Sequence, residues 1–270
     1  MPPTRTAKQR RYLVCPPEHF DVRYAINPWM TSLEPVDVPL AHKQWDALVS
    51  LYRELGHTVE TVEPVADLPD MVFAANSALV LDGRAFGAKF HAPQRQPEAG
   101  HYLTWFEGAG FETLVPSHTC EGEGDFTPVG GFILAGTGFR TLPAAHHEAQ
   151  EFFGTPTVSL HLVDPHFYHL DTALFALDDS NIAYYPGAFS NGSRQVLNKL
   201  FPDAVIATRQ DALAFGLNSI SDGRHVVMAQ DATGLMESVA AHGYEPIPVD
   251  LSEFRKAGGG AKCCTQELRG

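Results

Sequence analysis

The chain has 270 residues, 44% of them apolar, and carries 32 acidic against 19 basic side chains, for a formal net charge of −13. This length and composition favour a folded protein with a substantial core and exclude a largely disordered chain. The negative charge argues against a nucleic-acid partner, because binding to a phosphate backbone depends on basic residues that release its counterions. It allows a small cationic substrate.

The N-terminal stretch MPPTRTAKQRR is basic, but only YLVC follows it before two prolines, so it lacks the apolar core of a secretory signal. No stretch approaches the length needed to span a bilayer. Four cysteines are too few for a disulfide scaffold, and the adjacent pair Cys263 and Cys264 makes a poor bridge sterically. We therefore expect a cytoplasmic protein with free thiols, no membrane partner and one domain over residues 1–270. The sequence leaves a homo-oligomer open.

A repeat of helix-like segments and β-rich runs extends along the chain. The helix-like segments have apolar residues at helical spacing and end in or near glycine. They are expected at 48–56, 103–110, 146–154, 194–201 and 236–243. The β-rich runs that follow them are expected at 57–64, 111–117, 155–162, 202–209 and 244–250.

A polar residue and a hairpin-like pair of strands follow each β-rich run. The polar residues are Asn76, Asp125, Asp171, Asn218 and, near the C-terminus, Cys263. Subtracting their residue numbers gives spacings of 49, 46, 47 and 45. Because one such unit cannot bury its apolar face alone, the five units are expected to pack around a common centre.

The last unit stops soon after CCTQEL, which leaves its hairpin one strand short. The opening strand RRYLVCPP is available to complete it. This pairing would close a ring, hold the glycine-rich C-terminal segment in place and bring the five polar positions to one axis.

A closed ring would gather a thiol, an imidazole, amides and several carboxylates in one pocket. Such a set supplies a nucleophile, a general acid or base and a binding site for a cation. Its members are Asn76, Glu121, Glu123, Asp125, His169, Asp171, Asn218 and Cys263. Paired carboxylates bind a planar guanidinium through parallel charge-assisted hydrogen bonds.

Three motifs, HLDT at His169, EGEGD at 121–125 and GGAKCCT near the C-terminus, resemble those of the guanidino-group-modifying enzymes. The resemblance covers nearly the whole chain and implies a five-bladed α/β propeller that works without a cofactor. It implies that Cys263 attacks the guanidinium carbon to form a covalent thiouronium. It also implies that His169 protonates the leaving nitrogen and then activates water, and that Asp171 holds the guanidinium.

Two departures from the family pattern bear on the reaction. The acidic motif is one residue longer than usual, so either Glu121 or Glu123 can be the catalytic acid. Asn76 stands where deiminases carry an aspartate, and together with Asn27 it resembles the arginine dihydrolases, which give ornithine, ammonia and carbon dioxide. Arg95 is the candidate partner of the substrate carboxylate, since arginine offers a bidentate fork.

Other readings of these residues stay open. Arginine dihydrolase or deiminase chemistry comes first, then a dimethylargininase, an amidinotransferase and a non-catalytic binding protein for arginine-like ligands. The aspartates and asparagines are also common turn residues, and an arginine is often a solvated surface charge.

The histidines around 161–169 match no zinc spacing, so no metal is expected. A lid over the pocket is expected among residues 26–35 and 90–100.

Overall fold

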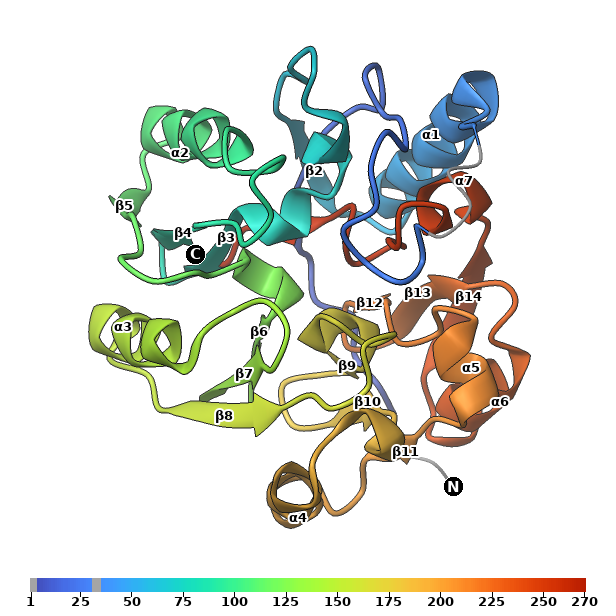
Figure 1. Cartoon of the computed structure of the whole chain (residues 1–270). Helices are drawn as coiled ribbons and strands as arrows, with labels where there is room; N and C mark the ends of the chain where they lie inside the picture. Colours follow the sequence, from blue (N-terminus) through green and yellow to red (C-terminus); the bar gives the residue numbers. More distant parts are fainter. Residues whose placement is uncertain (1–3, 31–34) are drawn as a thin grey trace.

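The computed structural model describes residues 4–30 and 35–270, and the part of the predicted lid at residues 31–34 lies outside them. Within the described residues, five small three-stranded sheets surround a central axis, with helices on the outside (Figure 1). This arrangement confirms the predicted five-bladed α/β propeller.

Each sheet has the same topology. An antiparallel hairpin supplies the first two strands, and a third strand pairs in parallel with the second strand of the hairpin. Four hairpins are continuous in sequence: β3 (Ala78–Leu81) with β4 (Arg84–Gly87), β6 (Phe126–Val129) with β7 (Phe132–Thr137), β9 (Leu174–Ala176) with β10 (Ile182–Tyr184), and β12 (Ile220–Ser221) with β13 (His225–Ala229). Their parallel partners are β5 (Glu112–Leu114), β8 (Thr157–His161), β11 (Val205–Ile206) and β14 (Glu245–Val249).

The fifth sheet joins the two ends of the chain. Strand β15 (Gln266–Glu267) pairs antiparallel with β1 (Arg11–Val14), opposing Tyr12 to Glu267, and β1 pairs in parallel with β2 (Thr58–Thr61). The predicted ring closure by the opening strand is therefore confirmed. It fixes the turn that carries Cys263.

A helix precedes the third strand of each sheet and covers its outer side (Figure 1). These helices are α1 (Val38–Glu54), α2 (Glu98–Gly108), α3 (Pro143–Phe153), α4 (Asn191–Leu200) and α6 (Thr233–Ala241). Helix α1 starts ten residues before its predicted position, because the Asp37 side chain caps it by accepting from the Leu40 N–H at 3.0 Å. Its apolar side, including Trp45, Leu48 and Tyr52, is buried.

Two short helices were not predicted, α5 (Arg209–Leu213) and α7 (Ser252–Arg255). Both are about one turn long, too short for a helical period to appear in the sequence. Thr208 caps α5 by accepting from the Asp211 N–H. Among residues 4–30 and 35–270, no helix has the length and apolar character needed to cross a bilayer.

The polar positions lie at the open ends of the hairpins. Three of them sit in or directly after a short 3₁₀ turn that leads into the first strand: Ala74–Ser77, Gly122–Gly124 and Leu170–Thr172. Asn218 precedes β12, and Cys263 lies in a turn before β15. Equivalent turns in five units around one axis thus bring together residues that are up to 187 positions apart, from Asn76 to Cys263.

Candidate active site

Cys263 is 2% exposed and makes contacts with two of the other polar positions. Its thiol donates to Asp171 Oδ2 at 3.2 Å and accepts from Asn218 Nδ2 at 3.1 Å, while its backbone N–H donates to Asn218 Oδ1 at 3.0 Å. Burial and the neighbouring Asp171 carboxylate raise the pKa of the thiol well above its usual range. The resting group is therefore a protonated thiol.

The glycines before Cys263 allow the turn to pack this closely. A Cβ at Gly259 would lie 2.2 Å from the Phe73 ring, and one at Gly260 would lie 2.9 Å from Asn218 Oδ1. Side chains at these two positions would push the turn away from the axis.

His169 and Glu121 form a buried pair. The imidazole Nε2 lies 2.6 Å from Glu121 Oε2, and Nδ1 has no hydrogen-bond partner among the described residues. Glu121 also receives two contacts from Arg140 Nη1, at 2.9 and 3.2 Å, and one from the His91 N–H at 2.9 Å. Although burial opposes its charge, Arg140 and His169 hold the pKa of Glu121 well below its usual range. The carboxylate is thus ionised and fixes the imidazole ring.

Glu123 is equally buried but lies among different partners. Its carboxylate pairs with Lys262 and with Arg269, and it accepts from the Glu267 N–H at 3.3 Å. Burial opposes the charge, but Arg269 and Lys262 lower the pKa of Glu123 below its usual value. The structure therefore brings Glu121, and not Glu123, to His169.

Asp125 and Asp171 have different surroundings. Both oxygens of Asp125 accept backbone N–H groups, from Leu170 at 3.0 Å and from Thr141 at 3.2 Å. The Asp125 carboxylate thus holds the residue next to His169. Asp171 Oδ1, by contrast, is buried without a hydrogen-bond partner among the described residues, and burial raises the pKa of Asp171 to about 6.

A cavity of about 250 Å³ lies over the thiol. It is lined by Ile26, Asn27, Met30, Asp70, Phe73, Asn76, Arg95, Arg140, Tyr168, Ala257 and Cys263. Of the six residues predicted to bind substrate, three line this cavity and three do not. Those that line it are Asn27, Asn76 and Arg95, and those that do not are Asp125, Asp171 and Asn218. Residues 26–30 of the predicted lid contribute three of its side chains.

The predicted residues on this wall are tied to one another. Asn76 Oδ1 accepts from Arg95 Nη1 at 2.8 Å, and Asn76 Nδ2 lies 3.4 Å from the Glu121 carbonyl. Arg95 also pairs with the fully buried Glu98, at 2.8 Å from Nη2. Asn27 accepts from the Trp29 N–H and donates to the Ala257 carbonyl at 3.0 Å.

Arg140, Asp70 and Tyr168 belong to the site but were not identified from the sequence. Arg140 links Glu121 to the Ile26 carbonyl, which it contacts at 2.6 Å, and its guanidinium lies over the Tyr168 ring. Asp70 is buried with Oδ2 bonded to the Tyr24 hydroxyl and Oδ1 without a partner among the described residues. One signal for Arg140 was available, because it follows Arg95 by 45 residues and occupies the same loop of the next unit.

Cys264, next to the nucleophile candidate, is buried in an apolar cluster with Tyr52 and Phe254. In the described ranges all four cysteines are free. No group of three or more histidine, cysteine, aspartate or glutamate side chains in those ranges is arranged to hold a metal ion.

The ring fold, the buried thiol and the imidazole–carboxylate pair near a cavity are the features expected of an α/β propeller enzyme that acts through a cysteine. Comparison with known proteins narrows that class. The chain is 48% identical to an N(G),N(G)-dimethylarginine dimethylaminohydrolase of Mycobacterium tuberculosis over 99% of its length and 88% of the relative's. It is 37% identical to the bifunctional arginine dihydrolase/ornithine cyclodeaminase ArgZ of Synechocystis, of which it spans 37%.

A solved structure of the N-terminal domain of an ArgZ variant, covalently bound to a reaction intermediate, superposes with a TM-score of 0.93 at 35% identity. It matches 96% of this chain and 98% of that domain. A dimethylarginine dimethylaminohydrolase adduct at 21% identity superposes with a TM-score of 0.78, which supports the fold alone. No family model matches the sequence. The chain belongs to the guanidino-group-modifying enzymes and is a hydrolase of guanidino C–N bonds.

Proposed function

We propose that the protein hydrolyses the guanidinium group of L-arginine to ornithine, two ammonia and carbon dioxide, with two waters consumed. The observation that carries this proposal is the placement of Cys263 and Asn76 on one cavity that is also lined by Arg95, Arg140 and Asp70. The thiol end suits a guanidinium carbon, and the charged wall suits an α-amino acid.

At the charged wall, Arg95 and Arg140 offer guanidinium groups to the substrate carboxylate. Asp70 Oδ1 and the carbonyls of Ile26 and Ala257 offer acceptors for the α-ammonium group. Burial raises the pKa of Asp70, and an ammonium group at Oδ1 would favour its ionised form. Arg95, which the sequence assigns to the substrate carboxylate, thus gains Arg140 as a partner in the proposal.

At the other end, we assign Cys263 as the nucleophile, with Asn218 orienting its sulfur. A bound guanidinium favours the thiolate electrostatically. The sulfur attacks the guanidinium carbon, and protonated His169 gives a proton from Nδ1 to the leaving nitrogen, releasing ammonia. The resulting thiouronium is attacked by a water that His169 deprotonates, and the thiolate leaves.

Glu121 orients His169 in this scheme, and Glu123 has no part in it. Asp171 holds the guanidinium, and Asp125 acts as a positioning residue instead of a substrate ligand because both of its oxygens are occupied. Asn76 presents a neutral amide that accepts both the guanidinium and the ureido group of the first product, so a second hydrolysis can follow. We further propose that residues 1–270 work as one catalytic domain, in the cytoplasm.

Dimethylargininase activity is the second candidate, and the 48% identity to the Mycobacterium tuberculosis enzyme favours it. It would require that the end of the cavity beside Phe73 admits two methyl groups on the terminal nitrogen. The reaction would give citrulline and dimethylamine by the same covalent route.

Product analysis by mass spectrometry separates the two. The purified protein is incubated with L-arginine, asymmetric dimethylarginine or citrulline, with Cys263→Ser as the matched control. We expect ornithine and ammonia from arginine, and nothing from the serine variant. Citrulline formed only from the methylated substrate would make the protein a dimethylargininase. Survival of all three compounds would overturn both candidates.

A further inference from the structure

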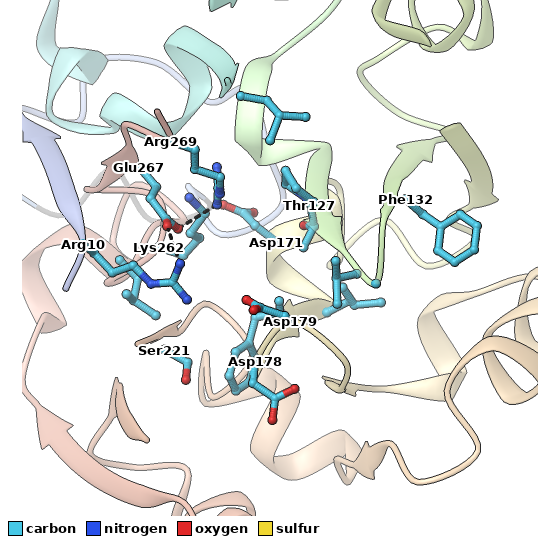
Figure 2. A pocket seen from close by; sticks show the side chains of 18 of the residues that line it. Arg10, Thr127, Phe132, Asp171, Asp178, Asp179, Ser221, Lys262, Glu267 and Arg269 are labelled. Atoms are coloured by element: carbon cyan, nitrogen blue, oxygen red, sulfur yellow. Dashed lines mark hydrogen bonds and ion pairs between the residues drawn. The ribbon is translucent and has the colours of Figure 1, made fainter. Parts of the chain in front are cut away.

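A second cavity opens at the other end of the ring axis, around the turns of the hairpins (Figure 2). We call it the far cavity. It contains about 1290 Å³ of empty space and is lined by residues that include Asp82, Gly130 and Asp179, each in or next to a hairpin turn. The Asp179 side chain is 65% exposed, so the mouth of this cavity opens to solvent.

The two cavities lie at opposite ends of the same strands. The substrate cavity is formed by the loops that enter and leave the hairpins, and the far cavity by the turns within them. The turn before β15 separates the two: Cys263 lines the substrate cavity, while Lys262 lines the far cavity. The residue next to Cys263 in the sequence therefore lines a second cavity.

Asp171 bridges this division. It accepts the thiol hydrogen bond at Oδ2, and it also lines the far cavity (Figure 2). Its other oxygen, Oδ1, has no partner among the described residues. Asp171 therefore lies between the reacting sulfur and the far cavity, with Oδ1 itself buried.

We propose that Asp171 takes the proton of Cys263 and passes it to water in the far cavity, so that protons and substrate reach the thiol from opposite ends of the ring. In the first step the Sγ–H bond breaks and an Oδ2–H bond forms. In the second step the O–H bond breaks, a far-cavity water becomes hydronium, and the Asp171 carboxylate is left free to hold the guanidinium. The proton returns by the same route when the thiolate is released.

The position of the bound substrate is the reason for a separate route. Cys263 is 2% exposed and lines the substrate cavity, so an amino acid bound there would cover the thiol. Solvent on that side is then excluded at the moment when the thiol must lose its proton. The proposal rests on the proposed function for its turnover assay.

The charged groups around Asp171 suit a transient proton acceptor. His169 lies on its own turn, Lys262 and Cys263 on the turn before β15, and Asp125 on the neighbouring unit. His169 and Lys262 stabilise the carboxylate, whereas burial, the strongest influence, opposes it. Asp171 therefore releases a proton readily at neutral pH once water can reach it.

Filling the far cavity next to Asp171 tests the route without touching the site residues. Thr127 on β6 is half-buried and lines the far cavity (Figure 2). We expect Thr127→Phe to lower kcat about tenfold, with KM within about twofold and an increased solvent deuterium isotope effect, because proton transfer becomes rate-limiting. Thr127→Leu should lie in between, and the nearly isosteric Thr127→Val should behave as the unmodified protein.

A folded Thr127→Phe protein with unchanged kcat and an unchanged solvent isotope effect would overturn the proposal. A raised KM with no change in the isotope effect would also overturn it, because that result indicates a distorted substrate site. If Thr127→Phe does not fold, Thr127→Leu decides on the same criteria. If no tested substrate is turned over, the proposed function fails, and the rate of Cys263 labelling by 2-chloroacetamidine decides instead. Slower labelling in the Phe variant than in the Val variant supports the route, and equal rates exclude it.

Discussion

At the substrate end of the ring, Glu121 pairs with Arg140 and touches His169; at the far end, Glu123 pairs with Lys262 and Arg269. The two glutamates are two residues apart and both are fully buried. They have the same side chain and similar pairs of charged partners. Glu121 contacts an imidazole whose other nitrogen is free among the described residues, whereas Glu123 contacts two cations and a backbone N–H. The comparison teaches that the partners contributed by other units, and not the local motif, divide catalytic from structural roles.

The backbone between them explains the division. Gly122 has φ of +53° and begins a 3₁₀ turn, and a Cβ there would lie 2.6 Å from the Ala78 nitrogen. This left-handed turn against the neighbouring unit directs the side chains of residues 121 and 123 to opposite ends of the axis. Exchanging or removing the two carboxylates one at a time is therefore the direct way to test the comparison.

The largest effect is expected from Glu121→Gln. Because the amide cannot hold a charged imidazole, we expect kcat to fall by about 10² to 10⁴, the range for loss of acid–base catalysis. The measurement is steady-state turnover of arginine or dimethylarginine, with Glu123→Gln as the matched control, for which kcat should stay within a few-fold. Cys263 should still be labelled by iodoacetamide, and Glu121→Asp should recover part of the activity. Equal losses in the two Gln variants would remove the distinction between the two ends.

The next effect is on stability and belongs to Glu123→Gln. It leaves Lys262 and Arg269 without their shared carboxylate, and loss of one member of a buried ion pair costs about 3 kcal/mol, less here because both cations are partly exposed. The folded-state pKa of Glu123 is lowered, so its contribution is present above the unfolded value of about 4.3 and is lost as pH falls through the folded value. Urea unfolding should therefore separate the variant from the unmodified protein at pH 7, and the difference should shrink as pH falls below about 4.3.

The double variant Glu123→Gln with Arg269→Met is the internal check on that number. Arg269 keeps an ion pair with Glu267 at 2.7 Å, so removing Arg269 once Glu123 is neutral should recover only part of the lost free energy of unfolding, giving a coupling between the two sites. Additive losses would mean that the ion pair contributes little and that the far end is held together by other contacts.

Much of this architecture could be predicted from the sequence because it repeats. Spacings near 47 residues between Asn76, Asp125, Asp171, Asn218 and Cys263 give five units, and a short last unit calls for the opening strand. The ring closure between Tyr12 and Glu267 follows from that pattern. The five polar positions meet at one axis because the five units form a ring.

The contacts within the site could not be predicted in the same way. The choice between Glu121 and Glu123 depends on the backbone angle at Gly122 and on Arg140 and Arg269, which come from other segments. Asp125 and Asp171 occupy equivalent places in successive units, yet one is saturated by backbone N–H groups and the other has a free oxygen. Such differences arise where units meet, and a repeat pattern describes only what the units share.

Asp171→Asn is expected to change stability with the opposite sign. Burial raises the folded-state pKa of Asp171 to about 6, above the unfolded value of about 3.9. The folded state therefore binds the extra proton between these values, and stability falls as pH rises through them and stays lower above pH 6. The neutral amide removes this cost, so we expect Asp171→Asn to be more stable than the unmodified protein by about 3 kcal/mol at pH 8 and indistinguishable from it at pH 3.5, while losing activity.

Asp125→Asn is the matched control, because burial also raises the pKa of Asp125. Its two oxygens accept the N–H groups of Leu170 and Thr141, and an amide nitrogen would face one of these donors. We therefore expect Asp125→Asn to be destabilised at both pH 8 and pH 3.5. Thermal unfolding of both variants and of the unmodified protein at the two pH values is the measurement. If Asp171→Asn is destabilised as well, the Asp171 carboxylate is a structural hydrogen-bond acceptor that stabilises the fold. Its burial would then not be a destabilising feature that serves the reaction.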